Sequence, residues 1–116
     1  MKLRLTDRFG ERCITVEDGH RLYAALHASF KGGEEVVIDL TGVRTLFSQF
    51  LNNSIGLLFR DFKPEAVGRL LRLENATHAQ QETIERVMIN AKAHYHEPLR
   101  RKIADDALAK IVEEMD

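Results

Sequence analysis

Along the first part of the chain, stretches that alternate polar and apolar residues give way to one with helical spacing. Residues 2–6 and 12–16 alternate, and a turn-like Asp-Arg-Phe-Gly lies between them, which predicts two strands joined as a hairpin. Residues 20–30 place their apolar side chains on one helical face, and Asp18 suits the N-cap position of this helix. The pair Gly32–Gly33 predicts its end.

A short run rich in β-branched residues predicts the central strand of the sheet. Glu35 to Leu40 (EVVIDL) has the composition of a strand that is covered on both faces in a parallel or mixed sheet. After a short polar turn the apolar residues recur at helical spacing, which predicts a helix from about Ser48 to Phe62. Lys63 and Pro64 are expected to end this helix.

The second half of the chain is predicted to contain one strand and two helices. Val67 to Leu73 has strand character, and His78 to His96 has the spacing of a long helix. Pro98 suits the first turn of a further helix, Leu99 to Met115. The apolar positions of this last segment recur every fourth residue and are Leu99, Ile103, Ala107, Ile111 and Met115.

The predicted order of elements is β-β-α-β-α-β-α-α, which indicates an α/β fold with helices packed on a small mixed sheet. The chain has 116 residues, 44% of them hydrophobic, which suffices for one domain with its own core. We place this domain at residues 1–95. The C-terminal helix, within residues 96–116, is expected either to pack on the domain or to contact a partner.

The net charge, the absence of long apolar runs and the single cysteine exclude several classes of function. The net charge of -1 provides no overall field that would attract nucleic acid or an anionic membrane. Because no apolar run resembles a signal peptide or a membrane span, we expect a cytoplasmic protein without membrane contact. Cys13 is the single cysteine, so it has no partner for an internal disulfide, and we expect a small, half-buried strand residue.

The central strand and the helix after it carry a family resemblance. The residues concerned are VVIDLTGV (Val36 to Val43), LFSQFLN (Leu46 to Asn52) and IGLL (Ile55 to Leu58). With these residues the chain resembles the STAS domain of bacterial anti-sigma-factor antagonists, and more closely the STAS-like family of unknown function. The resemblance spans roughly residues 1–95 and implies a STAS-like fold.

The resemblance also implies a function without catalysis. In STAS antagonists a serine at the start of the helix after the central strand controls the binding of a kinase or an anti-sigma factor. We therefore expect a bacterial signalling or regulatory module that binds a protein partner, either a histidine-kinase-type ATPase or an anti-sigma-type regulator. The implied partner-binding residues lie in the loop and helix after the central strand and are Thr45, Ser48, Gln49, Leu51 and Asn52.

This chain departs from the antagonist pattern at the acceptor position, which falls on Gln49, a residue that cannot be phosphorylated. Ser48 is adjacent, and phosphorylation there would add nearly two negative charges at a helix start. We favour the alternative in which Ser48 is the N-cap residue of the helix. On this view Gln49→Glu and Leu51→Asp should weaken partner binding without unfolding the protein.

The other polar residues do not form a recognisable catalytic, metal-binding or cofactor-binding motif. Asp39 either faces a nucleotide or metal at the carboxyl edge of the sheet or accepts hydrogen bonds from the turn at residues 41–43, and we favour the turn. His94 and His96 lack the three- or four-residue spacing that a zinc site on one helix needs. No glycine-rich phosphate loop and no nucleophile motif occurs in the sequence. We therefore expect no enzyme, no cofactor and no metal.

The C-terminal segment leaves two alternatives open. The basic cluster Arg100–Lys102 lies where a helix dipole disfavours positive charge, and it belongs either to a solvated first turn of a helix folded back on the domain or to a protruding helix. A protruding helix would dock on a partner or form a homodimer. The competing hypothesis is a small nucleic-acid-associated regulator that uses this cluster with Arg69 and Arg72, although the charge balance argues against it.

Overall fold

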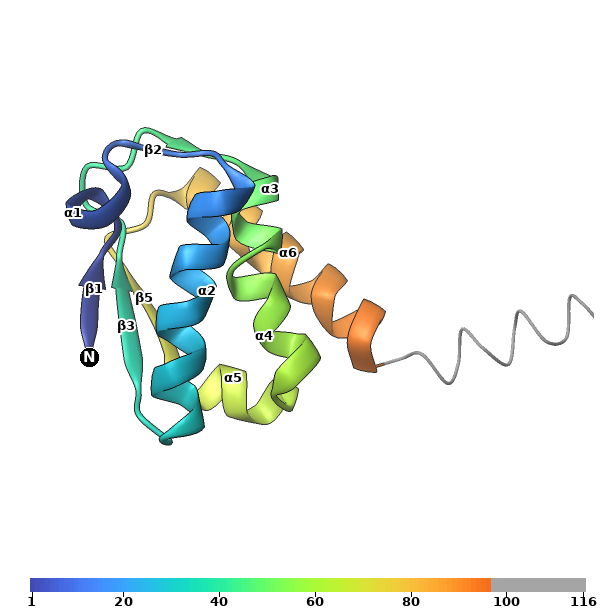
Figure 1. The fold of residues 1–116 in the computed structure, drawn as a ribbon. Helices are drawn as coiled ribbons and strands as arrows, with labels where there is room; N and C mark the ends of the chain where they lie inside the picture. Colours follow the sequence, from blue (N-terminus) through green and yellow to red (C-terminus); the bar gives the residue numbers. More distant parts are fainter. Residues whose placement is uncertain (97–116) are drawn as a thin grey trace, which may run out of the picture.

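Residues 1–96 form two small parallel sheets and six helices in the computed structural model, which describes this part of the chain (Figure 1). The predicted helix Leu99 to Met115 and the basic cluster Arg100–Lys102 lie outside the described residues. None of the described helices combines the length and the apolar character that crossing a membrane requires.

The main sheet consists of β1 (Lys2–Arg4), β3 (Val36–Asp39) and β5 (Leu71–Glu74) in the order β1-β3-β5. Both pairings are parallel, and the register places Ile38 beside Leu3 and Leu73. The prediction that the run from Glu35 to Leu40 supplies the central strand is confirmed. Parallel neighbours require crossover connections, which explains why helices separate these strands along the chain.

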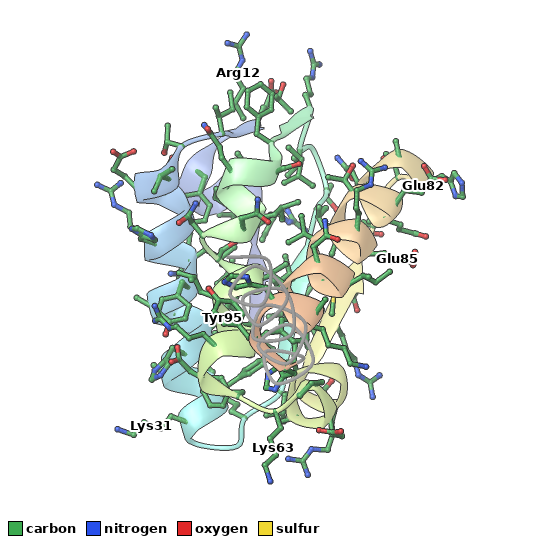
Figure 2. All side chains as sticks on the ribbon, turned by 90° about the vertical axis from the view of Figure 1, so that its right-hand side faces the viewer. Arg12, Lys31, Lys63, Glu82, Glu85 and Tyr95 are labelled. Carbon is green, nitrogen blue, oxygen red and sulfur yellow. The ribbon has the colours of Figure 1, made fainter. Side chains whose placement is uncertain are left out.

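Helices α2, α4 and α6 lie on one side of the main sheet (Figure 1), and Figure 2 shows them side by side in front of it. On the other face, Val37 lies in register between Lys2 and Arg72, both of which are exposed. The expectation of a central strand covered on both faces is therefore wrong for the face that carries the half-buried Val37. Its β-branched residues are accommodated because the aliphatic stems of long charged side chains can cover a neighbouring apolar residue.

The predicted N-terminal hairpin is also wrong. A short helix, α1 (Leu5–Phe9), follows β1 directly, and β2 (Arg12–Cys13) pairs in parallel with β4 (Thr45–Leu46) in a second sheet. Leu5 is buried on α1 and Phe9 packs against the core four residues later, which is helical spacing. The helical spacing of Leu5 and Phe9 was overlooked because residues 2–6 also alternate between polar and apolar.

Helix α2 (Val16–Lys31) begins earlier than predicted. Its N-cap residue is Thr15, whose hydroxyl oxygen accepts the Asp18 backbone N–H at 3.1 Å. Asp18 therefore lies in the first turn and is not the N-cap residue, although its charge there still suits the helix dipole. The predicted end is confirmed, because α2 stops at Gly32 and Gly33 has a φ of 73°, which glycine adopts without strain.

The remaining helices divide differently from the prediction. The expected helix from Ser48 to Phe62 consists of two, α3 (Ser48–Asn52) and α4 (Ile55–Asp61). Pro64 opens α5 (Pro64–Leu70), so the predicted strand from Val67 is helical up to Leu70. Helix α6 (His78–His96) has the predicted bounds. A capping box forms at its start: the Thr77 backbone N–H donates to Gln80 Oε1, and the Gln80 backbone N–H donates to the Thr77 hydroxyl oxygen.

The core lies between the sheet and the helices and draws on every described helix. Helices α2 and α3 approach closely at Gly19, where an added Cβ would lie 2.7 Å from the backbone oxygen of Phe50. Only glycine fits this contact without a backbone shift. The approach fixes α3 against α2, and α3 carries much of the candidate site.

We expect Gly19→Ala to lower the free energy of unfolding by about 1–3 kcal/mol, as overpacking at a backbone contact does. Gly68→Ala is the matched control, because Gly68 lies on α5 with nothing within 4 Å of an added Cβ. This change should raise the free energy of unfolding by about 0.5–1 kcal/mol, since alanine favours the helix. Urea unfolding measures both, and equal effects of the two substitutions would contradict the close approach.

Candidate functional site

The carboxylate of Asp39 joins the ends of the three parallel strands. Its Oδ1 accepts hydrogen bonds from the Thr41 backbone N–H at 2.9 Å, the Thr41 hydroxyl at 2.6 Å and the Asn75 side-chain amide at 3.0 Å. Its Oδ2 accepts one from Arg4 Nε at 3.2 Å. Asp39 ends β3, Arg4 ends β1 and Asn75 follows β5, so one side chain holds the whole carboxyl edge of the sheet.

These contacts give Asp39 a structural role. The side chain is 1% exposed, and its oxygens are occupied by protein donors. The hydrogen bond from the Thr41 hydroxyl, followed by that from Asn75, holds the pKa of Asp39 well below its ordinary value, although burial opposes this. The interpretation of Asp39 as an acceptor for the following turn is confirmed for Thr41, and the ionised carboxylate is committed to the turn and not to a ligand.

The chain from the turn to α3 is held along the strand β2. The backbone N–H groups of Arg44 and Thr45 both donate to the Glu11 carbonyl, at 2.9 and 3.1 Å. The N–H of Phe47 donates to the Cys13 carbonyl at 2.9 Å. The segment that leads into α3 is therefore fixed by main-chain hydrogen bonds, and the half-buried Thr45 lies within it.

The start of α3 presents Phe47 and Ser48 to solvent. Phe47 is the N-cap residue and its side chain is 47% exposed. Ser48 is the first helical residue and is exposed. The prediction that Ser48 is the N-cap residue is wrong, because the extended conformation required at that position occurs one residue earlier.

Gln49, which the resemblance to STAS antagonists places at their acceptor position, ties α3 to Ile14, directly after β2. Its side-chain amide donates to the Ile14 carbonyl at 2.7 Å. Its backbone carbonyl accepts a hydrogen bond from Asn53 Nδ2, also at 2.7 Å. Because Asn53 Nδ2 is the donor, Asn53 Oδ1 is the acceptor for His20 Nε2 at 3.1 Å. This polar chain links β2, α3 and the start of α2.

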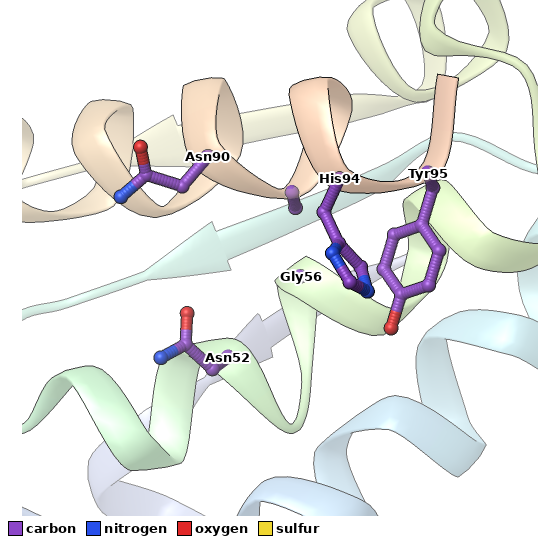
Figure 3. A pocket seen from close by; sticks show the side chains of 6 residues that line it. Asn52, Gly56, Asn90, His94 and Tyr95 are labelled. Carbon is purple, nitrogen blue, oxygen red and sulfur yellow. The ribbon is translucent and has the colours of Figure 1, made fainter. Parts of the chain in front are cut away.

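The next two residues of α3 differ in exposure. Leu51 is 1% exposed and belongs to the core, so the expectation that it lies in an exposed part of this unit is wrong. Asn52 is exposed beside a hollow of about 230 Å³ between α3, α4 and α6, where Figure 3 shows Asn52 and Asn90 on opposite walls. The hollow is lined by Asn52, Gly56, Asn90, Ala91, His94 and Tyr95.

The structure thus brings four predicted residues into one region. Thr45, Ser48, Gln49 and Asn52 all lie on β4 or α3, whereas Leu51 points into the core. Sequence reasoning missed Phe47, because its apolar character placed it on the buried face of the predicted helix. The break that ends α3 was also missed, although the adjacent Asn53 and Ser54 signal it. The hydroxyl of the buried Ser54 donates back to the Phe50 carbonyl at 2.8 Å.

Two features within residues 1–96 bear on reactive or metal chemistry: the environment of Cys13 and the placement of possible metal ligands. Burial, and then the charge of Asp18, raise the pKa of the Cys13 thiol to about 11, so the thiol is neutral and unreactive. Cys13 is fully buried, which corrects the half-buried prediction. No group of three or more histidine, cysteine, aspartate or glutamate residues in this range is placed to hold a metal ion.

The family model for the STAS-like domain of unknown function (DUF4325) matches residues 18–81. This range is more than half of the chain. It runs from the first turn of α2 through β3, β4, α3, α4, α5 and β5 to the start of α6. The chain therefore belongs to the family of STAS-like domains of unknown function, as the resemblance implied. No curated protein and no solved structure matches the chain.

Acid should reveal the contribution of Asp39 to stability. Its pKa is lowered in the folded state relative to an ordinary value of 3.8, so its stabilisation is complete above that value and is lost as the pH falls below about 4. Asp39→Asn should therefore be less stable than the native chain at neutral pH, and the difference should shrink on acidification. Urea unfolding from pH 7 to pH 3 measures this difference, and a constant difference would contradict the assignment.

Leu51→Asp should unfold the domain or destabilise it by more than about 3 kcal/mol, because it removes a buried leucine and places a carboxylate in the core. Asn52→Asp, at the neighbouring exposed position, introduces the same side chain and should change the stability by no more than about 0.5 kcal/mol. Circular dichroism during urea unfolding compares the two. A folded Leu51→Asp variant of native stability would place Leu51 back among the candidate contact residues.

Proposed function

We propose that this STAS-like domain is a non-catalytic, cytoplasmic interaction module of bacterial signalling or regulation. It binds a protein partner through a docking surface that consists of Thr45, Phe47, Ser48 and Asn52. The observation that carries the proposal is the exposure of Phe47, an aromatic residue that faces solvent at 47% while its own N–H is anchored to Cys13. Aromatic residues, phenylalanine included, are enriched in protein interfaces.

The hydrogen bonds at the base of this surface support a docking role because they hold its backbone in place. Gln49 holds Ile14, and Asp39 holds the turn that leads toward β4. A surface fixed in this way loses little conformational entropy when a partner binds, which favours affinity. Gln49 is exposed, and we propose that it both holds the docking surface in place through Ile14 and remains open to the direct contact expected from the sequence.

The chemistry of the docking surface indicates the kind of partner. Its four side chains are uncharged: one is aromatic, and the other three carry hydroxyl or amide groups. Such a surface fits an apolar pocket with a neutral polar rim on the partner, and its binding should depend little on salt. The family resemblance favours a histidine-kinase-type ATPase or an anti-sigma-type regulator as the protein that carries the pocket.

Regulation of this surface follows from the residues at the start of α3. Because Gln49 occupies the acceptor position, we propose that binding is controlled by the partner and not by phosphate at that position. Phosphorylation of the exposed Ser48 is the alternative, and it would place a double negative charge beside Phe47. The nucleic-acid alternative gains no support from Arg72, which pairs with Glu35 at 2.8 Å.

The first experiment is affinity capture from the native host with the full-length protein as bait, with mass spectrometry of both captured proteins and bait. We expect an ATPase or regulator to be retained by the native bait and lost with Phe47→Ser. An unmodified Ser48 in the bound bait supports control by the partner, whereas phosphate on Ser48 supports the alternative. Retention of nuclease-sensitive material alone would overturn the docking function.

With the captured partner purified, Phe47→Ser should weaken its affinity at least about fivefold, since truncation of an interface anchor costs more than about 1 kcal/mol. Arg69→Ser is the matched control, because Arg69 is exposed on α5 away from the docking surface. It should leave the affinity unchanged. Titration calorimetry measures both, and the opposite ranking would indicate that cationic contacts dominate.

A further inference from the structure

A second surface feature lies at the opposite end of the helical layer from the docking surface. Figure 1 shows α3 and α5 at the two ends of this layer, and Figure 2 places Arg12 and Lys63 correspondingly far apart. A groove of about 200 Å³ lies between α4, α5 and α6. Its lining is apolar except for one lysine and consists of Phe59, Pro64, Gly68, Met88, Ile89 and Lys92.

Ile89 lies at this groove with most of its side chain in water. It is 67% exposed on α6, more than the other large hydrophobic residues that are exposed within residues 1–96. Met88 beside it is only partly buried against the core. Because the removal of apolar surface from water is favourable, the groove and Ile89 together form a surface that an apolar partner can cover.

Gly68 opens the groove on the side of α5. It is exposed, and an added Cβ at this position would have nothing within 4 Å. Its φ is not among the positive values that favour glycine. A glycine inside a helix lowers stability relative to alanine. Within residues 1–96 no contact therefore requires glycine here, and the effect of the missing side chain is to leave space in the groove.

Two charged residues flank the apolar side chains along α6. Glu85 lies about one helical turn before Ile89, and Lys92 lies about one turn after it, so all three share one face of the helix. Both charged residues are exposed, and neither forms an ion pair within residues 1–96. They are two turns apart, or roughly 10 Å along the axis, which is too far for them to pair with each other. Figure 2 shows α6 in front of the sheet, with Glu85 on the side of the helix away from α2.

We propose that the face of α6 formed by Glu85, Met88, Ile89 and Lys92 binds the same face of a second copy of the chain, with the two helices antiparallel. A two-fold axis between Met88 and Ile89 places Ile89 of each copy on Met88 of the other, beside its groove. The same axis places Glu85 of each copy opposite Lys92 of the other, since Glu85 lies three residues before Met88 and Lys92 lies three residues after Ile89. Such a contact uses one surface twice, as two-fold homodimers do. The proposal is independent of the docking function.

The charge pattern is the reason to expect a second copy in this groove. An antiparallel copy brings an opposite charge to both Glu85 and Lys92, whereas a parallel copy in register would face each of them with its own kind. Gln81 and His96, which come next along this face, would lie opposite each other without repulsion between like charges. Charged pairs at an interface determine direction and register more than affinity, and the apolar contact around Ile89 supplies the affinity.

Sedimentation velocity of the full-length chain over a range of concentrations tests the proposal. We expect the native chain to form a dimer. Ile89→Lys should raise the dissociation constant of this dimer more than about tenfold, because the substitution occurs twice in each dimer. Asn90→Lys is the matched control, since it introduces the same side chain at the neighbouring exposed position, which lines the hollow beside α3 and not the groove. It should leave the dissociation constant unchanged.

Two charge reversals test the antiparallel register. Glu85→Lys and Lys92→Glu each place like charges opposite each other, so each variant alone should dimerise more weakly than the native chain at low salt. A mixture of the two variants should dimerise more strongly than either alone, because the lysines of one chain then face the glutamates of the other. This recovery requires two chains and cannot arise from a contact within one.

Each contrary outcome overturns the proposal. A native chain that stays monomeric up to the limit of its solubility has no second copy in the groove. A dimer that survives Ile89→Lys uses another surface, and if it is lost with Phe47→Ser the second copy binds the docking surface. A mixture of the charge-reversed chains that dimerises no better than either chain alone excludes the antiparallel register. Because the docking function is tested by partner capture with Phe47→Ser, failure of either proposal leaves the other intact.

Discussion

The arrangement of this domain depends on a single buried carboxylate at the carboxyl edge of its sheet. Parallel strands do not share a turn, so their ends need another means of alignment. Asp39 supplies it by accepting hydrogen bonds from Arg4 after β1, from Thr41 in its own turn and from Asn75 after β5. Asn75 also tolerates its φ of 57° better than most residues would. The direction in which the chain leaves β3 is therefore set by the same contacts that hold the sheet together.

Between that turn and the candidate docking surface, the chain is held in place by main-chain hydrogen bonds. The segment before α3 binds along β2, and Gln49 then joins α3 to Ile14. The close approach at Gly19 holds α3 against α2 from the other side. The side chains of this region therefore divide into two groups. Leu51 is buried in the core, whereas Phe47, Ser48, Gln49 and Asn52 are exposed, with the Gln49 amide bonded to the Ile14 carbonyl.

The sequence predicted those parts of the fold that depend on local pattern. The strand from Val36 and the helix from His78 to His96 were found because a β-branched run and a long helical period are strong signals. The hairpin prediction was wrong because Cys13 pairs with Leu46, which is distant in the sequence. A parallel pair of this kind has no connecting turn that could be recognised in the sequence. Phe47 was misplaced because an apolar residue at helical spacing is normally buried. Its exposure depends on where α3 begins, and helix boundaries are the least certain part of a pattern.

Gln49, which the resemblance to STAS antagonists places at their acceptor position, has a physical interpretation. A phosphorylated serine at that position would control binding by adding charge to an otherwise neutral surface. The glutamine here fills the position with an amide that donates to a backbone carbonyl, so its side chain is occupied by the fold itself. A negative charge at Gln49 would face the carbonyl of Ile14 and loosen the base of the surface, which is a structural effect and not a reversible signal. Under the proposed docking function, charge-based control would therefore act through the neighbouring Ser48 or through the partner.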